Sequence, residues 1–595
     1  MTKLISNNFK LFNAEQFVES FSEASFDVYY FYVGKHVPFS NDSTPPTLFD
    51  NINNTFIDPY ETMLYGKRIN TTDINLMTTR HDWTANTVYV KYTHDSNSLF
   101  GNNYYVAVDE GATYSVFKCL DNNNGQPSTY EPQAAETSAS DDFYITPDNY
   151  QWKFMYSIPS ATFSKFATST HMPVLVHANV VGNAVSGSID NIELINTGNG
   201  YASYANGIFQ EVVVGGNDTV FAIDPSSASS NANFYSNCAL KIVSGVGSGQ
   251  IKRITSYTVS GTTRRVTVDS AFSVTPTNAS GYEITPLVNI VGDGTGATAR
   301  AIVNSTSNTI HKVEIVTRGQ DYTYATISIT GNTGIINVAT SNTIQANNAT
   351  AKAIISPKGG HGSNAASELG AHYVGVSVTF DSTLSGGKVV DENDFRSAGI
   401  IKNALFSNVS LTISGGTGLF QDEEVVTQAN TGAYGIVVSS NSTVVKLSNA
   451  YGFFATGNST VNFITGGTST YTASVDGISQ PTTYIDQTTK FVATKISAAS
   501  FIEDEVVYQQ DANARYYSSN NTVMRVTNSK GTFNVSDIST TRFVDGLDST
   551  ARSSISAIIP GDLVRNSGDV LYVENFTPIT KDVGQTETMR LVLEF

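Results

Sequence analysis

The chain has 595 residues, and 40% of them are hydrophobic, which is enough to build several buried cores. Only 14% are charged, and 52 acidic against 34 basic residues leave a net charge of −18, which speaks against nucleic acid or an anionic membrane as a partner. No apolar run is long enough for a signal peptide or a membrane-spanning helix, so we expect a protein that is made in a cytoplasm and does not insert into a membrane.

The first part of the chain predicts one amphipathic helix followed mainly by strands. Apolar residues share a helical face within residues 14–23, and Asn13 is the expected N-cap. A second, shorter helix is expected at residues 160–166, directly after Pro159. Runs of aromatic and β-branched residues are typical of strands and occupy residues 27–33, 104–108 and 114–120.

Small polar residues and glycine become common from about residue 182, and short alternating segments there predict small all-β modules. Residues 189–201 and 310–322 repeat one pattern, in which an alternating strand is followed by glycine and then by a tyrosine that can cover the turn. A second repeat pairs residues 420–426 with 501–507 and residues 443–447 with 522–526. Two copies are too few for a solenoid, so we expect duplicated small β domains.

The end of the chain returns to the aromatic-rich texture of its beginning. It contains strand-like runs and closes on an alternating segment, residues 590–595, of a kind that is usually tied into a sheet. The pattern indicates a core that begins at the N-terminus, is interrupted by β modules and is completed at the C-terminus.

Signatures of catalysis and metal binding are missing from the sequence. No zinc-protease, nucleophile-elbow or P-loop motif occurs, and the glycine-rich residues 245–249 lack the following helix that a phosphate cradle needs. Cys119 and Cys238 are expected as thiols outside any disulfide. His361 is expected in a glycine turn, and Asp293 has too few neighbouring oxygen ligands for calcium. We therefore expect no enzyme activity, no cofactor and no metal.

Two acidic triplets, residues 422–424 and 503–505, stand at the same place in the second repeat. Such acids would be conceivable as paired catalytic carboxylates. Their repeated position favours a hairpin tip or a solvated strand edge, where charge prevents unwanted strand pairing. We expect them to be structural.

The most specific motif lies near the C-terminus. It reads Ser567-Gly568-Asp569-Val570-Leu571-Tyr572-Val573-Glu574-Asn575, then Pro578-Ile579 and Gln585-Thr586-Glu587. Further motifs precede it in order: residues 32–39, Arg80-His81-Asp82-Trp83, residues 117–121, 150–159 and 394–403. Together they resemble a baseplate wedge subunit of T-even-type contractile-tailed bacteriophages, the dimeric component known as the eighth gene product. Phe39 and Ala404 stand where that family commonly has tryptophan and proline.

The resemblance implies a mainly β fold: a layered β-sandwich core with a few short helices, interrupted by inserted small β domains. The expected core consists of residues 1–181, 366–407 and 546–595, and the expected insertions of residues 182–365 and 408–545. The resemblance also implies a structural protein of the virion, made in the host bacterial cytoplasm and placed in the tail baseplate. Its implied partners are a second copy of itself, other wedge subunits and, as a further candidate, tail-fibre-attachment proteins.

The motif residues are expected either to pack in the core or to contact partners: Arg80, Asp82, Trp83, Trp152, Arg396, Tyr572, Glu574, Asn575 and Gln585. For the first four, we favour core packing or an internal ion pair, and direct contact with a partner is the alternative. The insertions leave other roles open: decoration of the baseplate, a bridge to neighbouring wedges, or binding of a receptor glycan, which would make the chain partly an adhesin. A trimeric, tailspike-like depolymerase is a further class, and the missing short-period repeat speaks against it.

Overall fold

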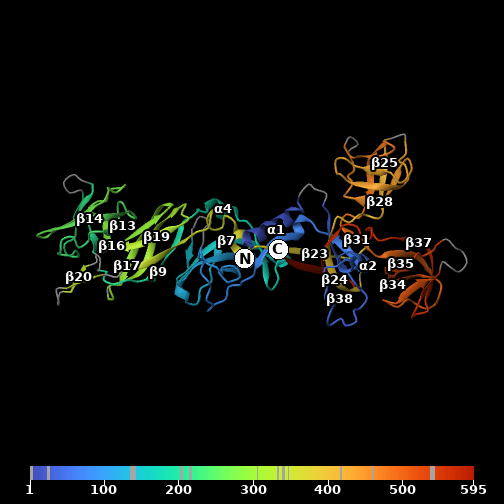
Figure 1. Ribbon diagram of the computed structural model, residues 1–595, viewed down its shortest axis with the longest axis horizontal. Coiled ribbons are helices and arrows are strands. Elements are labelled where there is room, and N and C mark those ends of the chain that lie inside the picture. Colours follow the sequence, from blue (N-terminus) through green and yellow to red (C-terminus); the bar gives the residue numbers. More distant parts are fainter. Residues whose placement is uncertain are drawn as a thin grey trace. The chain divides into compact units, whose positions relative to one another are not determined.

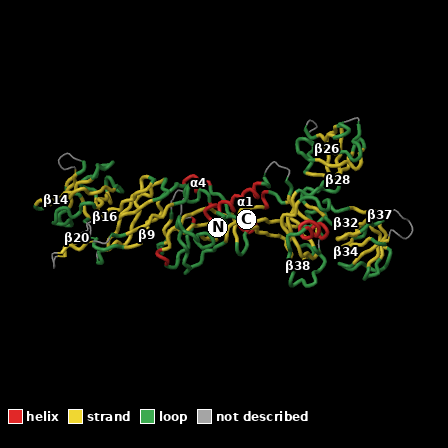
Figure 2. Tube along the Cα trace, viewed as in Figure 1, coloured by secondary structure: helices red, strands yellow, loops and turns green. Residues whose placement is uncertain are grey.

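In a computed structural model of the protein, strands take up 47% and helices 9% of the chain, so the predicted mainly β fold with a few short helices is confirmed (Figure 2). The structure describes residues 5–595 except 23–26, 135–142, 202–204, 213–217, 305, 331–333, 338–341, 346–347, 391, 416–417, 458–460 and 536–542. The chain forms two compact units: a sandwich unit, Met1–Met77 with His372–Phe595, and a middle unit, Thr78–Ala371.

Two sheets pack against each other in the sandwich unit (Figure 1). The first has the strand order β31 (Tyr484–Asp486), β2 (Met63–Arg68), β1 (Tyr29–Gly34), β24 (Asn393–Lys402), β38 (Asp569–Lys581), and the second contains β39 (Glu587–Glu594), β23 (Tyr373–Phe380), β3 (Ile74–Thr79). On β1, Phe31 and Val33 face the second sheet, whereas Tyr30 and Tyr32 pack on the opposite side. Both faces of β1 are buried, and this is why it has the sequence of an unbroken apolar run.

The first helix, α1 (Asn7–Glu19), starts earlier than predicted and covers the core of the sandwich with its apolar side. Its N-cap is Ser6, whose hydroxyl oxygen accepts from the backbone N–H of Phe9, so the predicted cap at Asn13 is wrong. Phe9 and Phe12 are more than half exposed, and these exposed aromatics obscured the apolar periodicity of the first two turns. Shorter helical segments of this unit are η1 (Asn53–Ile57), α2 (Asp58–Thr62) and η2 (Thr71–Asp73).

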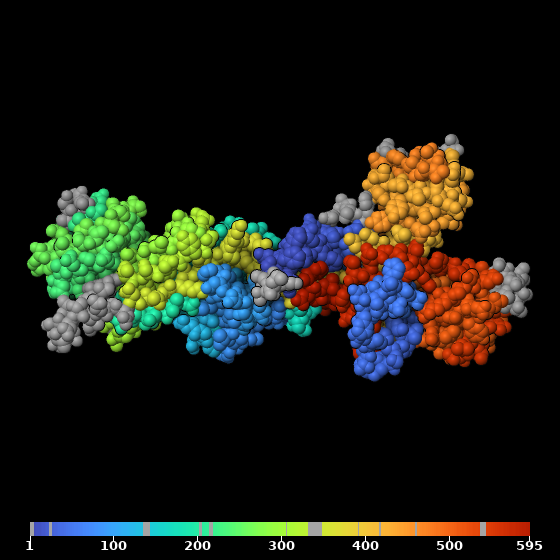
Figure 3. Space-filling view, in the orientation of Figure 1, coloured from blue at the N-terminus to red at the C-terminus, as the bar shows by residue number. Residues whose placement is uncertain are grey.

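Two closed six-stranded barrels also belong to the sandwich unit, and each is a compact mass in the space-filling view, the first orange and the second red (Figure 3). The first runs β25 (Val409–Ser414), β28 (Val444–Tyr451), β27 (Tyr434–Ser440), β26 (Val425–Thr427), β29 (Phe463–Gly466), β30 (Thr472–Ser479). The second runs β32 (Thr489–Lys495), β35 (Val523–Lys530), β34 (Ala512–Ser519), β33 (Val506–Gln509), β36 (Phe543–Gly546), β37 (Arg552–Ile559). Strand for strand, the two barrels have the same order.

The middle unit contains one four-stranded sheet and several short helices. The sheet has the order β4 (Tyr105–Asp109), β5 (Thr113–Asn122), β7 (Tyr150–Pro159), β6 (Tyr144–Ile145). Around it are η3 (Asn123–Gly125), α3 (Ser160–Phe166), β8 (His171–Pro173), α4 (Ala178–Asn183) and α5 (Ala365–Leu369). The helix α3 has the predicted bounds, because Pro159 fixes its start.

A long path of paired strands forms the rest of the middle unit. Its order is β11 (Glu211–Val212), β12 (Val220–Ile223), β15 (Thr263–Val268), β14 (Ile251–Ser260), β13 (Cys238–Ser244), β16 (Gly281–Gly292), β19 (Ala325–Thr330), β22 (Thr350–Ile355), β9 (Ile189–Asn196). Beside it lie β10 (Asn206–Ile208), β17 (Thr295–Asn304) and β18 (Thr309–Gln320), and β20 (Gly334–Asn337) pairs with β21 (Asn342–Gln345). The strand β16 links two cores, because Tyr282 packs in one and Val288 in the next.

The division of the chain differs from the expected domain bounds. The boundaries between the two units fall at residues 77 and 371, and the sheet built on β5 and β7 belongs to the middle unit with the segment that follows it. Its core also takes in Ile354 and Leu369, and this packing holds the two stretches together. The expected boundary at residue 545 lies within β36 of the second barrel.

Candidate functional site

Arg80 and Asp82 form an ion pair within the middle unit. Nη2 of Arg80 lies 2.8 Å from Oδ2 of Asp82, and Nη1 donates to the carbonyl oxygen of Thr168 at 3.0 Å. The guanidinium also lies 4.9 Å from the ring centroid of Phe163 on α3. Asp82 is exposed, so its carboxylate is open to further contacts.

The two tryptophans of the motif pack in one cluster of the same unit. Trp152 is completely buried and stacks on Tyr150 at 5.5 Å between ring centroids. Its indole N–H has no hydrogen-bond partner among the residues that the structure describes. Trp83 is half-buried and donates from Nε1 to Oγ of Ser128 at 3.3 Å. These contacts agree with core packing and an internal ion pair, and contact with a partner stays a prediction.

The remaining motif segments, which are far apart in sequence, meet in the sandwich unit. Residues 32–39, 394–403 and 567–575 all contribute to the walls of one cavity of about 310 Å³. We call it the motif cavity. Its lining residues from these segments are Tyr32, Lys35, Phe39, Ser397, Val573 and Asn575. The strands β1, β24 and β38 are direct neighbours in the sheet, and this pairing brings the segments together.

Lys35 lies in a strained and partly dehydrated position beside the motif cavity. Its backbone has a φ of 64°, in the left-handed region that non-glycine residues rarely adopt. Burial lowers the pKa of its ammonium group, and no carboxylate lies within ion-pair distance of it among the described residues. Strain of this kind persists only where the surrounding structure enforces it, often at a functional site.

Arg396 anchors the loop that follows Lys35. It is buried, donates from Nε to Oδ2 of Asp42 at 3.0 Å and from Nη1 to the carbonyl oxygen of His36, and lies 3.5 Å from Asp394. A guanidinium with three partners fixes the loop against β24. Arg396 is therefore a positioning residue for the cavity wall.

The C-terminal motif residues have different environments. Tyr572 donates to Oε2 of Glu574 at 2.6 Å, and burial followed by the neighbouring carboxylate raises the pKa of the phenol. Asn575 lines the motif cavity and donates from Nδ2 to the carbonyl oxygen of Pro46 at 3.1 Å. Gln585 is exposed and closes a turn on Asp582, accepting its backbone N–H at 3.1 Å.

Two buried polar atoms near the motif cavity lack partners among the described residues: the hydroxyl of Tyr32 and Oδ1 of Asn528. The Lys35 ammonium at the same wall lies 5.5 Å from the ring centroid of Phe39. Buried polar groups are usually paired. Both atoms are closed off from solvent, so a partner could reach them only after the cavity wall rearranged.

A buried charge network in the middle unit was not predicted. Nζ of Lys118 lies 2.9 Å from Oε2 of Glu368 and 3.1 Å from Nδ1 of His361, and Nε2 of His361 lies 2.7 Å from Oδ2 of Asp190. Nη1 of Arg318 lies 3.2 Å from Oδ1 of Asp190. Burial alone would raise the pKa of Glu368, but Lys118 and His361 lower it to about 2. The network joins strands β5, β9 and β18 to α5.

His361 lies in a turn, as predicted, and it also belongs to the buried charge network. It stands between Gly360 and Gly362, both with positive φ, and its ring is buried among charged partners. A Cβ at Gly360 would lie 2.4 Å from the backbone nitrogen of Val185, so only glycine permits the approach. In the sequence, the flanking glycines were the single sign that His361 has an unusual environment.

The acidic triplets also need a correction, because one glutamate of each is buried and not solvated. Glu424 accepts four hydrogen bonds, from the backbone N–H groups of Gln421, Thr468 and Ser469 and from the Ser469 hydroxyl, at 2.6–3.0 Å. Glu505 accepts the equivalent four in the second barrel. Each carboxylate therefore ties two loops of its barrel together.

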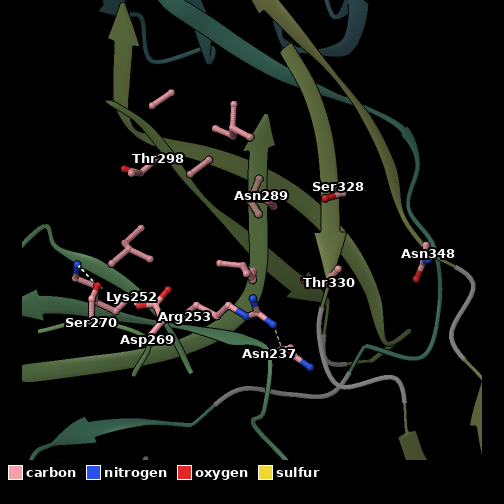
Figure 4. A pocket seen from close by; sticks show the side chains of 16 residues that line it. Asn237, Lys252, Arg253, Asp269, Ser270, Asn289, Thr298, Ser328, Thr330 and Asn348 are labelled. Atoms are coloured by element: carbon pink, nitrogen blue, oxygen red, sulfur yellow. Dashed lines mark hydrogen bonds between the residues drawn. The ribbon is translucent and has the colours of Figure 1, made fainter. Parts of the chain in front are cut away.

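A second cavity is an open groove of about 850 Å³ in the middle unit (Figure 4). It lies where β14 meets the strands β16, β17 and β19, and its walls are rich in hydroxyl, amide and charged side chains. No motif in the sequence predicts this groove, and only the polar composition of the segment agrees with it. The groove shares no residue with the motif cavity.

Among the described residues no group of His, Cys, Asp or Glu could hold a metal ion, and Cys119 and Cys238 are buried and form no disulfide with each other. No helix in the described part of the chain is long and apolar enough to cross a membrane. No protein-family model matches the chain, and no curated protein matches it either. The phage resemblance therefore stays a prediction that rests on the motifs.

Proposed function

We propose that the chain is a structural subunit of the tail baseplate wedge of a contractile-tailed bacteriophage. In this proposal it acts as a homodimer in the virion and joins neighbouring wedge subunits, with tail-fibre-attachment proteins as further candidates. One observation carries the proposal: three motif segments that resemble one family, hundreds of residues apart, line the same motif cavity.

The chemistry of the motif cavity supports a docking role. Lys35 places a cation at the wall that has no carboxylate within ion-pair distance among the described residues, and Arg396 fixes the adjoining loop. A preformed site of this kind loses little conformational freedom when a partner segment enters it. Aromatic residues at its walls, such as Phe39, are typical of protein interfaces.

The mass of the purified full-length chain in solution tests the homodimer. Light scattering after size exclusion is expected to give a single species near twice the 63.9 kDa of one chain. A stable trimer would contradict the proposal and favour a spike or fibre. A monomer at every concentration would remove the homodimer from it.

A further inference from the structure

The groove in the middle unit is built from two sides of different chemistry. Figure 4 shows one side with the charged residues Lys252, Arg253 and Asp269, and the other with Asn289, Ser328 and Thr330 on neighbouring strands. The strand β16 forms the floor at the point where it passes from one hydrophobic core to the next. Core side chains fix the floor from below, so the groove is preformed.

The charged side carries two cations, Lys252 and Arg253, and one carboxylate, Asp269. Among the described residues neither Lys252 nor Arg253 has an ion-pair partner. Nη2 of Arg253 donates to Oδ1 of Asn237 at 2.6 Å, and Nζ of Lys252 donates to Oγ of Ser270 at 2.9 Å. These neutral partners hold both side chains in place and leave their charges available to an anion. In a chain with a net charge of −18, two such cations in one groove are unusual.

The opposite side presents a row of small polar side chains. Asn289 on β16 stands directly across from Ser328 on β19, and Thr330 follows two residues later on the same face. All three are exposed, and the structure gives their side chains no hydrogen-bond partner among the described residues. Amide and hydroxyl groups on a flat strand surface both donate and accept, as sugar hydroxyl groups do.

We infer that this groove binds an acidic saccharide. One carboxylate of the saccharide takes the unused N–H groups of Arg253 and another takes the ammonium of Lys252, because the two charged ends point apart towards Asn237 and Ser270 (Figure 4). The sugar hydroxyl groups pair with Asn289, Ser328 and Thr330. The single carboxylate of the lining, Asp269, accepts from a further hydroxyl. This function goes beyond a structural role in the baseplate and gives the chain a means of holding a charged surface glycan.

The lining speaks against two alternatives: binding of an acidic peptide, and hydrolysis of the bound saccharide. An acidic peptide commonly needs an aromatic or large apolar anchor in a pocket, but the exposed wall residues here are polar, and the described part of the lining contains no aromatic residue. Hydrolysis of the saccharide commonly uses two carboxylates on either side of the bond, and Asp269 is the single carboxylate among the described residues of the lining. We therefore expect the groove to hold its ligand without hydrolysing it.

Titration calorimetry of the full-length protein with tri-galacturonic acid tests the inference. We expect saturable binding that weakens as sodium chloride is added, because the Arg253 and Lys252 contacts are ionic. The variant Arg253→Gln is expected to lose about 10–100-fold in affinity, the equivalent of one charge-assisted contact. Asn289→Ala is expected to weaken binding by a smaller factor, and chromatography of the sugar is expected to show no hydrolysis.

The matched control is Arg265→Gln, a half-buried arginine of β15 that does not line the groove and should leave the affinity unchanged. Equal binding of tri-aspartate would overturn the inference in favour of an acidic peptide, and equal binding of inorganic sulfate would reduce it to an anion site. Absence of saturable binding, or full affinity in Arg253→Gln, would reject it. None of these outcomes depends on the oligomeric state of the chain.

Discussion

At the scale of single residues, the barrels are tied together by buried carboxylates. Glu424 and Glu505 occupy equivalent places and accept equivalent hydrogen bonds from a loop with a serine, Ser469 or Ser549. Burial alone would raise the pKa of both carboxyl groups, but the donated hydrogen bonds lower it. The charge of each glutamate is therefore part of the barrel's stability.

Replacement of Glu424 by glutamine is expected to destabilise the first barrel by about 1–3 kcal/mol near neutral pH, because the amide cannot accept all four donors. A folded-state pKa below the unfolded value of about 4.3 means that the stabilisation is present above that value and is lost as the pH falls through the folded pKa. The difference in stability between Glu424→Gln and the wild type should therefore shrink as the pH falls. Hydrogen exchange of strands β26–β30, followed by mass spectrometry, measures it.

The neighbouring variant Glu423→Gln is the control. Glu423 is exposed, so its replacement should leave the exchange rates of the barrel unchanged at every pH. Equal effects of the two variants would mean that the buried carboxylate has no special role.

At the scale of elements, the close spacing of β1, β24 and β38 depends on a glycine. Gly399 on β24 stands opposite Tyr32 on β1 and Val573 on β38. A Cβ there would lie 2.3 Å from the carbonyl oxygen of Tyr572 and 2.5 Å from the hydroxyl of Tyr32. The first of these atoms belongs to a paired backbone and cannot withdraw without breaking the sheet.

The variant Gly399→Ala is therefore expected to destabilise the sandwich unit by about 1–3 kcal/mol, the usual cost of overpacking. Faster hydrogen exchange in β24 and β38 would report it. Gly182→Ala is the comparison, because among the described residues no atom outside its own helix lies within 4 Å of the added Cβ, and its φ is ordinary. If both variants exchange like the wild type, the sheet tolerates a wider spacing than the structure indicates.

At the scale of the whole molecule, the chain has two units with separate cores. Both tryptophans, Trp83 and Trp152, belong to the middle unit, so tryptophan fluorescence reports on the unfolding of that unit alone. The charge network around Lys118 lies in the same unit. Breaking this network should therefore lower the stability of the middle unit, which fluorescence reports, and should leave the stability of the sandwich unit unchanged.

We expect Lys118→Met to cost the middle unit about 3–5 kcal/mol, because Glu368 loses the cation that compensates its buried charge. Urea unfolding followed by tryptophan fluorescence should show a lower midpoint. Hydrogen exchange in the sandwich unit should not change. Lys358→Met removes an exposed lysine of the same unit and should leave the midpoint where it is; an equal shift there would argue against the network.

The sequence by itself determined the mainly β fold, the short helix after Pro159 and the internal repeats, because these depend on local periodicity and turn residues. It misplaced the start of α1, since Ser6 and Asn13 are equally good caps and only packing selects between them. The tertiary structure decided where the motif cavity, the network of Lys118 and Glu368, and the polar groove of the middle unit lie. Each joins residues from distant segments, and burial, which makes their charges and hydrogen bonds strong, arises only when those segments pack together.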